Sequence, residues 1–276
     1  MLNATMERLP NGRRLRVARV GDGPPLVLLH GYPDNLQIWS ALAPLLAGHF
    51  QVIAFDWPGM GQSEEWPGAV TPVHMADRLL ELLEVWGITR ATIVGLDMGG
   101  QPALAFAARH PSRTQSIVVL NSLVLWDEET SWEIAMLRRF GWNRWILGNL
   151  PRPVFERALR TFLPRGTRLP ADLRDDLWES FRRPEVRRFI ARLCAAYQGT
   201  LPKLPELYQK IACPTLLLWA EQDRHFPPIQ GERLQRLIPG SVCEVIPGAR
   251  HWMVWSEADE VARRILVRTP RSCRSE

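Results

Sequence analysis

The 276-residue sequence has little cysteine and no long apolar run. Its four cysteines form neither a C-x-x-C pair nor the spacing of metal ligands; they are Cys194, Cys213, Cys243 and Cys273. We therefore expect reduced thiols, no disulfide framework and no metal site. No apolar stretch approaches the ~20 residues that cross a bilayer, so no membrane span is expected.

The N-terminus lacks the continuous apolar region of a signal peptide, because charged residues interrupt residues 1–21. The simplest interpretation is a cytoplasmic protein that has no membrane partner. Internal repeats and low-complexity segments are also missing. The length suits one large globular domain, or a domain with an insertion.

The net charge of +5 is concentrated in the middle of the chain. Residues 122–205 contain 15 Arg and Lys against 10 Asp and Glu. The rest of the chain contains 19 basic and 19 acidic residues and is therefore neutral. A basic surface can indicate nucleic-acid binding. However, these arginines recur at helical spacing among Trp and Leu, and no nucleic-acid-binding motif accompanies them. We interpret them as solvated helix faces and expect no nucleic-acid partner.

Short apolar runs alternate with helical patterns in both flanks of this region. Apolar runs predict buried strands at residues 25–30, 51–56, 91–97, 116–122, 214–223 and 241–249, and residues 73–87 predict a helix. Asn11-Gly12 predicts the turn of an N-terminal hairpin. Strands that are apolar on both faces and alternate with helices indicate an α/β fold with a mostly parallel sheet covered on both sides.

Residues 123–206 break this alternation. They contain no convincing strand, several helical patterns, and many prolines and tryptophans. We predict a helical cap inserted into a core domain that comprises residues 1–122 and 207–276. Such a cap would cover the carboxyl edge of the sheet, where open α/β sheets bind ligands.

The segment "ATIVGLDMGGQPAL" at residues 91–104 predicts a sharp turn between a buried strand and a helix. In a Gly-x-nucleophile-x-Gly turn the middle residue is usually serine, but here it is Asp97. The loop "HGYPD" also follows a strand. The backbone N–H groups of Tyr32 and Met98 are therefore predicted to form a two-donor oxyanion hole.

Two further residues complete a candidate catalytic triad. Asp223 lies just beyond the strand in "LLLWAEQD", and His251 lies in the loop "PGARHW" after the last strand. One helix and one strand fit between them, which returns His251 to the same sheet edge. The order nucleophile, acid, histidine is that of α/β-hydrolases. The alternative interpretations are a turn aspartate, a helix cap and a packed histidine.

Three other polar residues near these motifs are assigned structural roles. His225 follows Asp223 by two residues, and His30 is expected to order its own loop. Asn121 follows the strand at 116–120, but an amide cannot supply the charge of a catalytic acid. Asp223 is therefore the predicted acid.

These motifs together make the chain resemble an α/β-hydrolase of the branch that includes epoxide hydrolases and haloalkane and haloacetate dehalogenases. The resemblance runs from about Pro24 to Val267 and is carried by "HGYP", "DWPGMGQS", "GLDMGG", "LLLWAEQD" and "PGARHW" in that order. It implies an α/β-hydrolase fold with a helical cap.

An aspartate nucleophile indicates a different reaction from that of a serine. Serine attack on a saturated carbon leaves an ether, which water does not cleave at neutral pH. Carboxylate attack leaves an ester, which a water activated by His251 can hydrolyse while Asp223 orients the histidine. The predicted substrate is therefore attacked at sp³ carbon, and no cofactor is expected.

The leaving group separates the subfamilies of this branch. Haloalkane dehalogenases use an Asn and a Trp where this chain has Tyr32 and Met98, and haloacetate dehalogenases use arginines just after the nucleophile, where it has none. Epoxide hydrolases activate the oxirane with cap tyrosines. Tyr197 lies near the end of the cap and is the predicted activating residue, with Tyr208 in reserve.

The prediction is an epoxide hydrolase that forms a vicinal diol, acts on a small apolar substrate with water, and has Trp39 and Trp126 in its substrate pocket. The first alternative is a haloalkane or haloacid dehalogenase that uses the same Asp-His-Asp triad. The second is a non-catalytic small-molecule binder on the same scaffold. The sequence leaves the substrate, its stereochemistry and the oligomeric state open.

Overall fold

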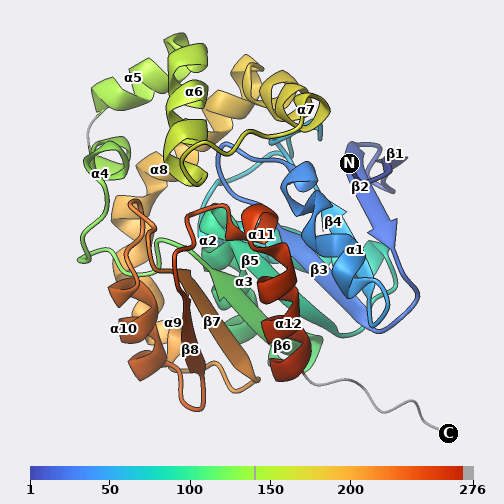
Figure 1. The fold of residues 1–276 in the computed structure, drawn as a ribbon. Helices are drawn as coiled ribbons and strands as arrows, with labels where there is room; N and C mark the ends of the chain where they lie inside the picture. Colours follow the sequence, from blue (N-terminus) through green and yellow to red (C-terminus); the bar gives the residue numbers. More distant parts are fainter. Residues whose placement is uncertain (140, 270–276) are drawn as a thin grey trace, which may run out of the picture.

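The computed structural model describes residues 1–139 and 141–269, and an eight-stranded sheet runs through it (Figure 1). Its strand order is β1-β2-β4-β3-β5-β6-β7-β8. The strands are β1 Ala4–Arg8, β2 Arg14–Val20, β3 Pro25–Leu29, β4 Gln51–Phe55, β5 Ala91–Leu96, β6 Thr114–Leu120, β7 Thr215–Ala220 and β8 Val242–Ile246.

Six of the strands are parallel, and only the N-terminal hairpin is antiparallel. The hairpin turns at Asn11-Gly12, where Gly12 has a φ of 80°. Strands β5 and β7 are buried along their whole length, because helices cover both faces of the sheet. The predicted α/β fold with a mostly parallel sheet is thus confirmed.

The helices that cover the sheet follow the expected sequence signals. Helix α2 begins at Pro72 after the Thr71 side chain caps it, and the chain turns away at Gly87, where φ is 67°. Helix α2 packs against α3 on one face of the sheet, and α1 packs against α12 on the other. The helices outside the β6–β7 connection are η1 Leu36–Ser40, α1 Leu42–Leu46, α2 Pro72–Val85, η2 Asp97–Gly99, α3 Gly100–Arg109, η3 Pro111–Arg113, α10 Ile229–Leu237, α11 Met253–Ser256 and α12 Ala258–Arg268.

The connection between β6 and β7 is helical, and we call it the α4–α9 segment. Figure 1 shows α4 to α8 above the carboxyl edge of the sheet, while α9 packs against α3. Prolines begin α6 and α8, where a missing N–H costs no hydrogen bond. The segment comprises α4 Trp132–Arg139, α5 Gly141–Asn149, α6 Pro151–Phe162, α7 Ala171–Phe181, α8 Pro184–Thr200, η4 Leu201–Lys203 and α9 Leu204–Tyr208.

A buried polar contact ties α7 to the sheet. The Arg16 guanidinium on β2 donates two hydrogen bonds to the carboxylate of Asp176, at 2.9 and 2.7 Å. Asn35 Nδ2, in the loop before η1, donates to Asp176 Oδ1 at 2.7 Å and to Ser180 Oγ at 2.7 Å. The Asp176 carboxylate on α7 thereby contacts both strand β2 and the loop before η1.

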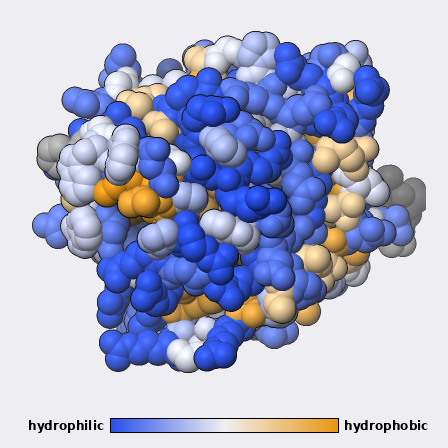
Figure 2. All heavy atoms as spheres, turned by 90° about the horizontal axis from the view of Figure 1, so that it is seen from above, coloured by the Kyte–Doolittle hydropathy of each residue, from blue (hydrophilic) through white to orange (hydrophobic). Residues whose placement is uncertain are grey.

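The arginines of the α4–α9 segment are not all solvated, contrary to the sequence interpretation. Arg138 and Arg187 are buried, and both donate to backbone carbonyl groups. Arg157 is exposed but pairs with Glu133. Seen from above, most of the molecular surface is hydrophilic, with several small apolar patches (Figure 2). None of the described helices combines the length and the apolar character needed to cross a membrane.

Candidate active site

The turn between β5 and α3 holds Asp97 in a strained conformation. Its φ is 52°, which L-residues other than Asn and Asp rarely adopt. The flanking glycines make the turn possible. A Cβ on Gly95 would lie 2.3 Å from the carbonyl oxygen of Gly99, and a Cβ on Gly99 would lie 2.1 Å from that of Leu29. The predicted strand–turn–helix therefore presents Asp97 at the carboxyl edge of the sheet.

Two backbone amides bind one oxygen of the Asp97 carboxylate. Tyr32 N–H donates to Asp97 Oδ1 at 3.0 Å, and Met98 N–H donates to the same atom at 2.5 Å. Gly31 allows this approach, because a Cβ there would lie 2.6 Å from Oδ1. The structure thus brings together the two predicted oxyanion-hole donors and leaves Asp97 Oδ2 without an amide partner.

The structure also brings together the three residues of the predicted triad. His251 Nδ1 lies 2.7 Å from Asp223 Oδ2, and His251 Nε2 lies 3.6 Å from Asp97 Oδ2. The other oxygen of Asp223 accepts hydrogen bonds from the backbone N–H groups of His225 and Phe226, at 2.8 and 3.1 Å. Asp223 is therefore fixed in place, and it orients the imidazole toward Asp97.

The two carboxylates determine the protonation state of His251. Burial alone would lower the pKa of this imidazole, but Asp223 and Asp97 favour its charged form and raise the pKa to about 10. The resting site therefore holds an imidazolium between two carboxylates at neutral pH. Any reaction that neutralises Asp97 removes one of the two groups that hold this proton.

Asn121 and His30 have structural positions beside the triad. Asn121 Nδ2 donates to the carbonyl oxygen of His251 at 2.8 Å, and its Oδ1 accepts from Ala220 N–H at 2.8 Å. Asn121 thereby ties the His251 loop to the end of β7. His30 Nε2 accepts from Trp57 N–H at 3.1 Å, within the core below the loop at 31–35.

Asp34 is a buried carboxyl group beside the site that the sequence analysis missed. Neither of its oxygens has a hydrogen-bond partner among the described residues. Burial, and then the nearby charge of Asp97, raise the pKa of Asp34 to about 8. The group therefore favours its protonated form at neutral pH.

A small chamber of about 20 Å³ lies against Asp97. The Tyr197 hydroxyl lines this chamber and donates to Gln101 Oε1 at 3.3 Å, while Gln101 Nε2 donates to the carbonyl oxygen of Leu123. Burial raises the pKa of Tyr197, so its hydroxyl stays protonated. The lining residues are Tyr32, Asp97, Met98, Gln101, Leu123, Ile134, Leu137, Arg138, Cys194, Tyr197 and Phe226.

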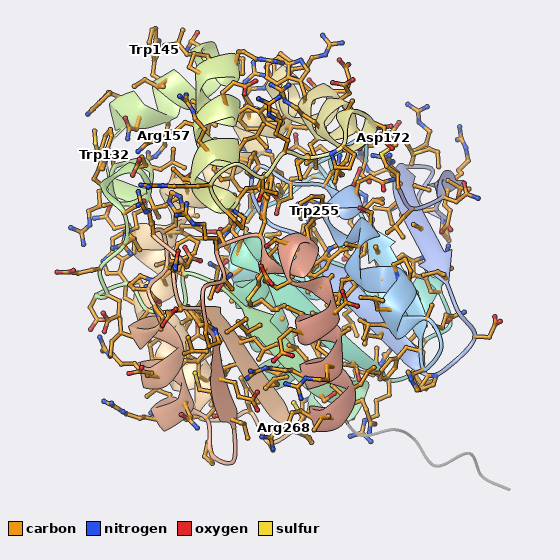
Figure 3. The ribbon with its side chains drawn as sticks, viewed as in Figure 1. Trp132, Trp145, Arg157, Asp172, Trp255 and Arg268 are labelled. Carbon is orange, nitrogen blue, oxygen red and sulfur yellow. The ribbon has the colours of Figure 1, made fainter. Side chains whose placement is uncertain are left out.

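A larger cavity of about 310 Å³ adjoins the chamber and opens between α4, α5 and α6. Tyr32, Ile134 and Leu137 line both spaces, so they form a shared wall. Trp132 and Arg157 both line the outer cavity, and Figure 3 shows them close together. Most of the remaining lining residues are apolar, and they include Ile146, Leu147, Pro153, Val154, Ala158 and Phe162.

Three aromatic residues proposed from the sequence lie away from both spaces. Trp39 is completely buried in the core, and Trp126 stacks under the guanidinium of Arg138. Neither tryptophan lines the chamber or the outer cavity, whereas Ile134 and Leu137 line both. Tyr208, the reserve donor, is buried and donates to the carbonyl oxygen of Val124 at 3.0 Å.

The sequence analysis also missed Gln101, Cys194 and Arg138. Gln101 lies one helical turn after Asp97, and Cys194 lies three residues before Tyr197 on α8, so helical spacing from the predicted residues would have identified both. No such signal marks Arg138, because its sequence neighbours match those of the solvated arginines. Among residues 1–139 and 141–269, no group of His, Cys, Asp and Glu has the arrangement of a metal site.

Comparison with known proteins identifies the family. The model of the alpha/beta hydrolase fold family matches residues 24–258. The chain therefore belongs to the α/β-hydrolase fold family, and its many relatives with hydrolase names support an enzyme.

The relatives act on several kinds of bond. A 2-hydroxy-6-oxononadienedioate/2-hydroxy-6-oxononatrienedioate hydrolase of Pseudomonas putida is 27% identical over 259 residues, which cover 90% of this chain and 88% of the relative. The fluoroacetate dehalogenase of a Burkholderia species is 34% identical over 149 residues, about half of each chain. The solved structure of the epoxide hydrolase CorEH has a TM-score of 0.80 at 18% identity, and the match covers 97% of this chain and 98% of CorEH.

Proposed function

We propose that this chain hydrolyses an epoxide to a vicinal diol through an ester on Asp97. The observation that carries the proposal is the arrangement of that carboxylate. Two amides hold Asp97 Oδ1, while Oδ2 lies beside His251 in the chamber that Tyr197 also lines. A carboxylate in place of the usual serine suits attack at sp³ carbon.

In the first step, Asp97 Oδ2 attacks a carbon of the oxirane ring. The C–O bond of the ring breaks, and the Tyr197 hydroxyl donates a hydrogen bond, then its proton, to the leaving oxygen. Tyr197 suits this role because its hydroxyl stays protonated in the buried chamber. The product of the step is a hydroxyalkyl ester of Asp97.

Formation of the ester changes the charge around His251. The Asp97 carboxylate becomes neutral, so the imidazolium loses one of its two negative partners and its pKa falls. His251 can then pass its proton back to the Tyr197 oxygen, which restores that hydroxyl, and act as a general base, with Asp223 still orienting Nδ1. The first chemical step thus prepares the base for the second.

In the second step, His251 Nε2 removes a proton from a water molecule that attacks Cγ of the Asp97 ester. The negative charge that develops on Asp97 Oδ1 is stabilised by the N–H groups of Tyr32 and Met98, which already bind this oxygen. Collapse of the tetrahedral intermediate expels the diol and restores the carboxylate.

We further propose that the α4–α9 segment is the cap predicted for residues 123–206, and that residues 1–122 and 207–276 form the catalytic core. The segment supplies Tyr197 and both helical walls of the chamber, from α4 and α8. It therefore excludes water from the carboxylate and positions the donor to the leaving oxygen.

A trapping experiment tests the proposal. Asp97→Asn should lower diol formation by about 10³-fold or more, because the nucleophile is lost. His251→Asn should form the ester and stall, so its intact mass should increase by the full mass of the epoxide. The matched control is His49→Asn at an exposed histidine, which should retain activity and show no adduct. Diol formation that survives Asp97→Asn would contradict the mechanism.

The identity to the fluoroacetate dehalogenase supports a second candidate, hydrolysis of a carbon–halogen bond. The same His251→Asn protein distinguishes the two. A haloalkane would add only its alkyl group to Asp97, and a haloacetate only its carboxymethyl group, with release of halide. An epoxide adds all of its atoms. Halide release by the wild-type protein without diol formation would favour the dehalogenase.

A further inference from the structure

Arg138, on α4, brings a positive charge to the chamber of the nucleophile. Its side chain is only 2% exposed, and it lines the same chamber as Asp97 and Tyr197. Burial lowers the pKa of Arg138 to about 10, so its guanidinium is still charged at neutral pH. Burial of such a charge is costly unless an opposite charge accompanies it.

The described residues supply no such partner for Arg138. No carboxylate oxygen of residues 1–139 and 141–269 lies within 4.0 Å of its guanidinium, although six other arginines of the α4–α9 segment form ion pairs. Its two terminal nitrogens each donate to a backbone carbonyl oxygen, those of Trp126 and Glu128, both at 3.1 Å.

The remaining donors of Arg138 are free for a ligand. A guanidinium has five N–H groups, and only two are used by these backbone bonds. Nε is buried without any hydrogen-bond partner among the described residues. The Trp126 ring, 4.7 Å from Cζ, fixes one face of the group and so holds it in a single orientation.

We propose that Arg138 binds a carboxylate of the substrate, and that the substrate of the proposed reaction is an epoxide with a carboxylate on the ring or one carbon away from it. The inference rests on the proposed function for the reaction itself. A carboxylate matches the planar N–H donors of a guanidinium. Its distance from the ring follows from the chamber, whose volume of about 20 Å³ leaves room for few atoms between Arg138 and Asp97.

The charge of Arg138 also solves a problem that an anionic substrate creates. Asp97 is negative when the substrate arrives, and a second carboxylate in the same chamber would repel it. Arg138 offsets this repulsion at a point away from the Oδ2 atom that attacks. The apolar outer cavity then accommodates the rest of a longer substrate.

The test compares 2,3-epoxypropanoate with the neutral 2,3-epoxypropanamide. The wild-type protein should prefer the acid, and Arg138→Gln should lower kcat/KM for the acid by about 10- to 100-fold while the amide changes less than threefold. Arg138→Lys, which keeps the charge, should recover part of the loss for the acid alone. The matched control is Arg188→Gln at an exposed arginine on α8, which should change kcat/KM for neither substrate. Equal losses for both substrates would make Arg138 a structural anchor and overturn the proposal.

A binding measurement separates this inference from the proposed function. Propanoate and propanamide contain no reactive ring, and tryptophan fluorescence can follow their binding because Trp126 contacts Arg138. Propanoate should bind the wild-type protein at least tenfold more tightly than propanamide, and Arg138→Gln should abolish the difference. This result without epoxide turnover would reject the proposed function but keep the carboxylate site. Equal binding of both probes to the wild-type protein would overturn the site.

Discussion

At the scale of single residues, the site is a balance of buried charges. Asp223 and Asp97 raise the pKa of the buried His251, and burial together with Asp97 raises the pKa of Asp34. Arg138 adds a positive charge on the opposite wall. Each change in the charge of Asp97 therefore alters the proton affinity of His251.

This coupling predicts a change in the titration of His251. Asp97→Asn removes one of the carboxylates that raise the pKa of His251 to about 10, so the pKa should fall. NMR spectra of protein with labelled histidine should show His251 losing its proton at a lower pH in the variant. An unchanged titration would show that Asp97 does not stabilise the imidazolium.

The same shift has a consequence for stability. The folded-state pKa lies above the ordinary value of 6.5, so the folded protein binds the proton more tightly than the unfolded chain does. The stabilisation is complete below about pH 6.5 and is lost as the pH rises through about 10. Urea unfolding across this window should show a smaller loss in Asp97→Asn than in the wild-type protein.

The residues of the triad were predictable from sequence, whereas the other charged residues of the site were not. Asp97, Asp223 and His251 each follow a buried strand, and parallel strands end at one edge of a sheet. Asp34 and Arg138 are buried by tertiary packing, and Arg138 lines the chamber together with residues far from it in the chain, such as Gln101 and Tyr197. Their neighbours in sequence give no sign of that burial, so Arg138 was expected among solvated arginines.

At the scale of elements, the turn from β5 to α3 fits closely against β3. The carbonyl oxygen of Leu29, at the end of β3, occupies the space beside Gly99. The two atoms nearest to an added Cβ on Gly99 are the carbonyl oxygen and carbon of Leu29, which no side-chain rotation can move away. The sequence predicted this element well because its two glycines and the flanking apolar run are local signals, and the same holds for the strands and for α2.

Gly99→Ala should therefore destabilise the protein. The added Cβ would lie 2.1 Å from the Leu29 carbonyl oxygen, and the resulting displacement should cost about 2 kcal/mol or more in the free energy of unfolding. The matched control is Gly199→Ala on α8, where no atom lies within 4 Å of the added Cβ. That change should stabilise the protein by about 0.5 to 1 kcal/mol. Urea denaturation of the two variants measures both effects, and equal stabilities would contradict the packing argument.

At the scale of the whole molecule, Asp176 is one of the residues that hold the α4–α9 segment on the core, beside Arg183, which donates to the carbonyl oxygen of Gly61, and Arg192, which pairs with Glu65. The Asp176 carboxylate accepts hydrogen bonds from Arg16 on β2 and from Asn35 in the loop that follows Tyr32. The orientation of α7, and of α8 after it, therefore depends on contacts with β2 and with this loop. The sequence indicated a helical segment at 123–206 but gave no sign of which residue anchors it, because Arg16 and Asp176 are 160 residues apart.

Asp176→Ala should loosen this connection. Arg16 keeps only its longer contact with Asp56, at 3.7 Å, so we expect a loss of about 2 kcal/mol in the free energy of unfolding. Hydrogen exchange should also become faster in α7 than in the sheet. The matched control is Asp172→Ala, an exposed residue on the same helix (Figure 3), which should leave both measurements nearly unchanged. Uniform exchange rates in the two variants would show that Asp176 is no anchor.

The wall shared by the two cavities has a consequence for the timing of turnover. Ile134 and Leu137 both belong to α4, and with Tyr32 they separate the outer cavity from the carboxylate. We expect a bulky substrate that enters through the outer cavity to reach Asp97 only after this wall moves aside. For bulky substrates the slow event is then a movement of α4, and solvent viscosity, which slows helix motion but not bond breaking, would limit the rate.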